Sequence, residues 1–120
     1  MERPLAGKRI LVVEDEALIG FLIEDMLRNL GAVVVGPMST VAQGMTAADC
    51  EDVDAAMLDI NVRGFRSFPI VSVLERRGVP YFFATGYGPS GIEPAHRDVP
   101  MINKPFVQNE LLQVIETVLA

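Results

Sequence analysis

The chain has 120 residues, half of them hydrophobic, and a formal net charge of −6. This length is enough for about one domain with a single core, so we expect residues 1–120 to form one domain. The acidic balance disfavours direct nucleic-acid binding, which depends on clustered Lys and Arg. Charged residues interrupt every apolar run before the roughly 20 residues that a membrane span needs. The N-terminus lacks the apolar core of a signal peptide, so we expect a cytoplasmic protein.

The first half of the chain alternates short apolar runs with helical stripes. Residues 10–13 predict a buried strand, and the next apolar residues recur at the spacing of a helix that ends near Gly31. Residues 32–35 predict a second strand that Gly36 and Pro37 end. A weaker helix follows, capped by Ser39 or Thr40 and disfavoured by a glycine in its interior.

The second half repeats this alternation. Strands are expected at residues 55–58, 81–84 and 99–102, with a helix at 67–77 and a terminal helix at 110–119. Glycines and prolines between residues 86 and 100 leave room for a short or irregular helix at most. Five continuous apolar strands with about five intervening helices favour an α/β fold, a doubly wound three-layer sandwich around a parallel sheet.

Polar side chains stand directly after the predicted strands. Glu14, Asp15 and Glu16 follow the first strand and Asp59 follows the third, while Thr85 and Lys104 follow the last two. The carboxyl ends of parallel strands meet at one edge of a sheet. Clustered carboxylates resist full ionisation unless a cation lies among them, and oxygen ligands suit Mg²⁺. With a hydroxyl and an ammonium group beside the ion, the set predicts an aspartyl-phosphate site.

Four segments carry a resemblance to a known family. In this order and at these intervals they resemble the receiver domain of two-component response regulators: Val12-Val13-Glu14-Asp15-Glu16, Leu58-Asp59-Ile60-Asn61, Ala84-Thr85-Gly86 and Lys104-Pro105-Phe106. The resemblance covers essentially the whole chain. It implies a flavodoxin-like fold with strand order 2-1-3-4-5. The segment Phe83-Ala84-Thr85-Gly86 is similar to the subgroup named for its Phe-Ala-Thr-Gly motif.

The resemblance also implies a role for each matching residue. Asp59 would accept the phosphoryl group, with Thr85 and Lys104 contacting it. Mg²⁺ would be held by Asp15 and Asp59 directly, by Glu14 through a bound water and by the backbone carbonyl of Asn61. The peptide bond between Lys104 and Pro105 is expected to be cis.

Two positions depart from the family pattern. Many receivers have Asp where this chain has Glu14, and a longer carboxylate should still serve through a water molecule. Receivers commonly place Tyr or Phe where this chain has Met101, so the chain lacks the usual aromatic residue of the switch at this position. Tyr87, two residues after Thr85, is a candidate for part of that role.

We therefore expect a single-domain response regulator that signals through protein partners. A sensor histidine kinase or a phosphotransfer protein would supply the phosphoryl group, and a downstream protein would read the phosphorylated state. We expect a phosphoacceptor that catalyses only its own phosphorylation and dephosphorylation. The response is expected in the glycine- and proline-rich segment between residues 86 and 100.

Two alternatives remain open at this point. The chain could be an interaction module that keeps the receiver fold without phosphorylation, although the complete set of acids, Thr and Lys argues against this. It could also be an aspartyl-phosphate phosphatase, which uses an Asp nucleophile with Mg²⁺. Such enzymes want an acid two residues after the nucleophile, where this chain has Asn61. Taken singly, the acids after the first strand could also be a helix start favoured by the helix dipole.

Overall fold

The computed structural model of the protein describes residues 3–86 and 98–120. Its main sheet has five parallel strands in the order β2-β1-β3-β6-β7. Their bounds are Val33–Met38 (β2), Arg9–Val13 (β1), Ala55–Asp59 (β3), Tyr81–Thr85 (β6) and Met101–Asn103 (β7). Counted within this sheet, the order is 2-1-3-4-5, so the flavodoxin-like α/β architecture is confirmed.

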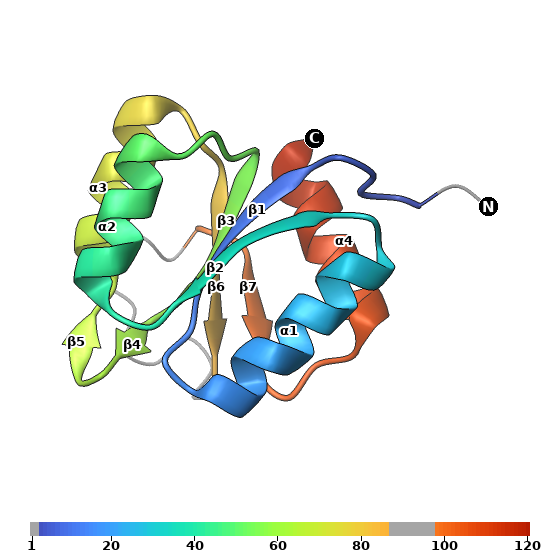
Figure 1. The fold of residues 1–120 in the computed structure, drawn as a ribbon, viewed down its shortest axis with the longest axis horizontal. Helices are drawn as coiled ribbons and strands as arrows, with labels where there is room; N and C mark the ends of the chain where they lie inside the picture. The colour runs from blue at the N-terminus through green and yellow to red at the C-terminus, as the bar shows by residue number, and fades with distance from the viewer. Residues whose placement is uncertain (1–2, 87–97) are drawn as a thin grey trace.

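Four helices of the described residues cover the two faces of the sheet, which gives three layers (Figure 1). Helices α1 (Ala17–Asn29) and α4 (Gln108–Leu119) lie on one face, and α2 (Val41–Cys50) and α3 (Phe68–Arg77) on the other. A fifth helix was expected between residues 86 and 100. Residues 87–97 of that segment, Tyr87 included, lie outside the described part of the chain.

Side chains of each strand alternate between two cores. In β1, Ile10 and Val12 pack toward α1 and α4, whereas Leu11 and Val13 pack toward α2 and α3. All four are almost completely buried. Because successive side chains of a strand point to opposite faces, continuous apolar runs mark strands covered on both sides.

Helix α2 begins at a predicted cap residue, and α3 ends at a glycine. The Thr40 hydroxyl accepts a hydrogen bond from the Gln43 N–H at 3.0 Å and caps α2. Gly78 ends α3 in the left-handed conformation with φ of 70°, and Pro69 lies in the first turn of that helix. Ser67 occupies the N-cap position of α3, but its side chain makes no capping hydrogen bond. Its hydroxyl is buried without a hydrogen-bond partner among the described residues.

One expectation at a glycine was wrong, and a second glycine has a packing role. Gly36 and Pro37 do not end the second strand, because β2 continues through them to Met38 with an irregularity opposite β1. Helix α2 forms through Gly44 despite the low helix propensity of glycine. A Cβ at this position would lie 2.6 Å from the Cδ1 of Ile70 and 3.1 Å from the Cγ2 of Val13. The glycine therefore allows α2 to pack closely against α3 and the sheet.

A small antiparallel hairpin follows β3 and was not predicted. Its strands are β4 (Asn61–Val62) and β5 (Phe65–Arg66). The hairpin projects beside the carboxyl end of β3, on the side of α2 and α3 (Figure 1). None of the helices within residues 3–86 and 98–120 is both long and apolar enough to cross a membrane.

Gly36 offers a test of how tightly β2 packs on β1. Its φ is 108°, and a Cβ there would lie 2.7 Å from the Met38 nitrogen and 2.8 Å from the Val12 carbonyl oxygen. We expect Gly36→Ala to lower the free energy of unfolding by about 2 kcal/mol or more, measured by urea denaturation. The matched control is Gly7→Ala, because Gly7 has φ of 75° with open space around it. That variant should lose only roughly 1 kcal/mol for its backbone conformation. Equal losses in the two variants would contradict the predicted backbone collision.

Candidate phosphoacceptor site

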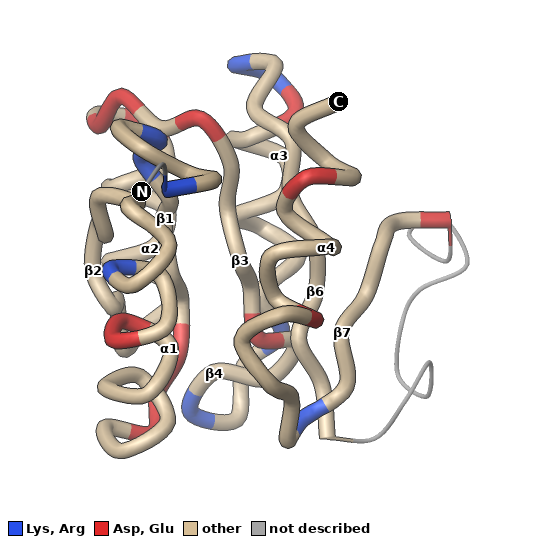
Figure 2. Tube along the Cα trace, turned by 90° about the vertical axis from the view of Figure 1, so that its right-hand side faces the viewer, with Lys and Arg blue, Asp and Glu red and all other residues tan. Residues whose placement is uncertain are grey.

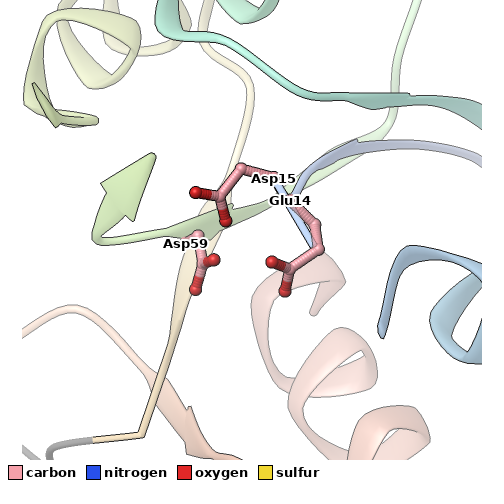
Figure 3. A group of neighbouring side chains, drawn as sticks. All are labelled: Glu14, Asp15 and Asp59. Atoms are coloured by element: carbon pink, nitrogen blue, oxygen red, sulfur yellow. The ribbon is translucent and has the colours of Figure 1, made fainter. Parts of the chain in front are cut away.

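The acidic cluster forms because β1 and β3 are neighbours in the sheet. Val13 pairs with Leu58, so Glu14 and Asp59 follow adjacent strand ends. Ligand oxygens of Glu14, Asp15 and Asp59 all lie within 4.8 Å of one another, and the carboxylates face a common space (Figure 3). Glu14 and Asp59 are buried, with 3% and 8% of their surface exposed. Asp15 is half-buried.

Lys104 brings a positive charge to this cluster from the far side of the sheet. It follows β7, and Figure 2 shows a basic segment after β7 at the same end of the sheet as the acidic segment that ends β3. Its Nζ lies 2.7 Å from the Oε1 of Glu14 and 2.7 Å from the Oδ1 of Asp59. The ammonium group thus bridges both buried carboxylates. The peptide bond between Lys104 and Pro105 is cis, as predicted, and that between Gly36 and Pro37 is also cis.

Burial and neighbouring charges shift the protonation of this pair. Burial raises the pKa of Asp59 to about 7, and a hydrogen bond with Glu14 acts in the same direction, while Lys104 opposes both. Burial by itself would lower the pKa of Lys104. The hydrogen bonds and negative charges of Asp59 and Glu14 outweigh that effect and hold the Lys104 pKa above its usual value. The site therefore holds an ammonium ion and a carboxyl group that ionises near neutral pH.

A hollow of about 390 Å³ opens beside Asp59. Its lining includes five of the six residues predicted for the site, namely Asp15, Asp59, Asn61, Thr85 and Lys104. Glu14 joins them through its ion pair with Lys104. Thr85 is buried at the end of β6, and its carbonyl accepts the Lys104 N–H at 2.8 Å. Four strand ends therefore converge on one site, as the sequence predicted, and the unpredicted hairpin joins them there through Asn61 and Gly64.

Glu16 lies at the edge of this arrangement. It is exposed and immediately precedes α1, and its side chain makes no capping hydrogen bond. Its backbone N–H donates to the Oε2 of Glu14 at 3.1 Å. Glu16 thus orients a buried carboxylate through its main chain, and its own carboxylate fits the helix-start interpretation.

The sequence did not predict a contact between the hairpin and the acids. The backbone N–H of Arg63 donates to the Oδ2 of Asp15 at 2.8 Å. Gly64, between the apolar residues Val62 and Phe65, was the one sign of a turn that the sequence offered here. Met101 packs beside Phe83, its partner across β6 and β7, at the edge of the core that includes α2 and α3.

The donor set fits a hard divalent cation. Carboxylate oxygens from two strand ends lie close enough to share one ion, and the hollow gives water molecules access to it. Mg²⁺ keeps several waters and is typically held by one or two carboxylates, which matches a site with one open side. Lys104 already places one positive charge between two of these carboxylates.

Comparison with known proteins gives the family. No protein-family model matches the chain. The solution structure of SdrG from Sphingomonas melonis Fr1 is similar at 36% identity with a TM-score of 0.85, covering 95% of this chain and 98% of that one. SdrG has also been solved in its BeF3-activated conformation, again at 36% identity.

Two further relatives carry informative names. The receiver domain of the sensor histidine kinase PA1611 from Pseudomonas aeruginosa PAO1 is 25% identical, with a TM-score of 0.83 and 95% of this chain covered. That structure holds a magnesium ion in its active-site cleft. The transcriptional regulatory protein TcrA from Mycobacterium tuberculosis is 33% identical over 117 residues, or 89% of this chain. The chain spans about half the length of the curated relatives it matches, between 44% and 55%. From its fold, its acidic strand-end cluster and its likeness to SdrG over nearly the whole of both chains, this chain belongs to the response-regulator receiver domains, which are phosphoacceptor signalling modules.

Proposed function

We propose that this chain is a single-domain response regulator that accepts a phosphoryl group on Asp59 in a Mg²⁺-dependent reaction. One observation carries the proposal. Asp59 lies at the end of β3 beside an open hollow, with the Lys104 ammonium 2.7 Å away and two further carboxylates within 4.8 Å. A sensor histidine kinase or a phosphotransfer protein would donate the group as phosphohistidine.

The transfer needs only a nucleophile and charge stabilisation. An oxygen of ionised Asp59 forms a bond to phosphorus while the bond between phosphorus and the histidine nitrogen breaks, and the imidazole leaves with that electron pair. Negative charge stays on the phosphoryl oxygens. Lys104 already contacts Asp59 and is placed to pair with one of these oxygens, as a point charge suited to phosphate. Thr85 and the backbone N–H groups that follow β3 and β6 are assigned to the others.

The metal ion would be held by Glu14, Asp15, Asp59 and the backbone carbonyl of Asn61. When bound, Mg²⁺ supplies positive charge beside the attacking carboxylate and a phosphoryl oxygen. In the structure, Lys104 pairs with both Glu14 and Asp59. With a metal ion bound, these carboxylates would contact both the ammonium group and the ion. The magnesium ion in the cleft of the PA1611 receiver domain supports this assignment.

The comparisons support a protein that acts through partners. This chain spans nearly all of SdrG, and SdrG adopts a BeF3-activated conformation. We propose that residues 1–120 form one receiver domain in the cytoplasm with a downstream protein as its target, and we assign it to the Phe-Ala-Thr-Gly subgroup from residues 83–86. The negative charge added at the strand ends would bias the surrounding loops and alter that contact.

The proposal is tested by intact-protein mass spectrometry after incubation with acetyl phosphate. We expect a single phosphoryl adduct with Mg²⁺ present and less than about a tenth as much after chelation, because the ion offsets charge on the attacking oxygen. Asp59→Asn should form no adduct. The matched control is Asp25→Asn on the exposed side of α1, which should be phosphorylated like the wild type. Unmodified protein with Mg²⁺ bound would contradict a phosphoacceptor role and favour a phosphorylation-independent module.

A second prediction follows from the pKa of Asp59. Because this pKa is about 7 in the folded protein against 3.8 for the free group, the folded state binds the proton more tightly. Protonation of Asp59 therefore makes its full contribution to the free energy of unfolding below about pH 4, and this contribution is lost as the pH rises through about 7. We therefore expect Asp59→Asn to raise the free energy of unfolding of the metal-free protein at pH 8 by ~1–3 kcal/mol. The gain should shrink toward pH 4.

The measurement is urea denaturation in chelator at several pH values, with Asp25→Asn as the surface control. Adding Mg²⁺ should stabilise the wild type at pH 8, since the ion binds the folded state, and should stabilise Asp59→Asn much less. A difference between Asp59→Asn and wild type that does not change between pH 4 and pH 8 would refute the assignment of the raised pKa to Asp59.

A further inference from the structure

The β4–β5 hairpin contacts the acidic cluster through its turn. We propose that the turn formed by Arg63 and Gly64 orients Asp15 for the metal ion, through the backbone N–H of Arg63. The inference rests on the proposed function, because it concerns a ligand of the proposed Mg²⁺ site. It adds a positioning residue that lies outside the acid, Thr and Lys set.

The turn has an unusual backbone. Val62 pairs with Phe65, which leaves a two-residue loop with φ of 51° at Arg63 and 82° at Gly64. Positive φ at both loop residues is what a type I′ hairpin turn requires, and Asn-Gly is the favoured pair there. Arg63 is the single non-glycine residue with positive φ in the described ranges 3–86 and 98–120. This conformation costs a residue with a Cβ roughly 1 kcal/mol, so compensating contacts are expected.

Arg63 makes two such contacts. Its backbone N–H donates to the Oδ2 of Asp15 at 2.8 Å, and its Nε donates to the carbonyl of Ser39 at 3.0 Å. The first is a charge-assisted bond to a carboxylate, a strong class of hydrogen bond. The second fastens the turn to the loop after β2. Together they connect the ends of β1 and β2 to the hairpin that follows β3.

Asp15 needs an external partner more than the other two acids do. Glu14 and Asp59 are buried and both contact Lys104, whereas Asp15 is half-buried, so packing alone restrains it less. With Oδ2 fixed by Arg63, the other oxygen of Asp15 remains available to a metal ion. Partners that orient a metal ligand in this way commonly contribute tenfold to a hundredfold in metal affinity.

The test separates the backbone of Arg63 from its guanidinium group. Mg²⁺ affinity is measured by NMR titration of metal-free protein with MgCl₂, without any phosphodonor. Arg63→Val disfavours positive φ and should weaken binding about tenfold or more. Arg63→Asn lacks the guanidinium group but accepts positive φ readily, and should stay within about threefold of the wild type. Arg66→Val is the matched control in the exposed end of the same hairpin and should bind normally.

Wild-type affinity in Arg63→Val would overturn the proposal, and so would an equal loss in Arg63→Val and Arg63→Asn. Failure of the wild type to bind Mg²⁺ would instead refute the proposed function. A second measurement on the metal-free protein remains decisive in that case or if Arg63→Val does not fold. The Arg63 amide proton should be shifted downfield and protected from exchange, and both properties should disappear in Asp15→Ala. An Arg63 amide that already exchanges freely in the wild type would overturn the inference.

Discussion

The bridge that Lys104 forms between Glu14 and Asp59 is the interaction on which the site depends. The parallel strands β1 and β3 end at the same edge of the sheet, so the carboxylates of Glu14 and Asp59 are buried side by side. Without a cation, that arrangement would favour a protonated, unreactive Asp59. The ammonium group, 2.7 Å from both acids, balances the cluster while leaving one side open to the hollow. A metal ion in that hollow would add positive charge beside the carboxylates, and a phosphoryl group would add negative charge beside Lys104.

The scaffold makes this arrangement rigid where the chemistry needs it. The strands that carry Glu14, Asp59 and Thr85 are buried on both faces, and their helices pack closely, as the contact between Gly44 and Ile70 shows. The segment after β6 follows directly on Thr85. We therefore expect a change of charge at Asp59 to alter the conformation of the surrounding loops and not that of the buried sheet.

Local sequence rules succeeded wherever burial on both faces dominated. The strands and the helices α1, α3 and α4 follow from apolar periodicity, and the strand ends alone brought the acids, Thr85 and Lys104 together. The same rules failed at Gly36 and did not predict the close contact at Gly44. By its local sequence, each glycine predicts an interruption of its strand or helix. Each instead allows a close approach, of Gly36 to the backbone of β1 and of Gly44 to Ile70. Propensity describes one residue, whereas these contacts depend on what lies opposite it.

The sequence by itself determined the parallel fold and the family resemblance and predicted a set of site residues, because each of these depends on the order of residues along single strands and helices. Only the tertiary structure decided how the side chains pair. That Lys104 contacts Glu14 as well as Asp59, and that the Arg63 N–H meets Asp15, depend on separations of 90 and 48 positions along the chain. Such contacts arise from the docking of separate elements, which no local pattern records.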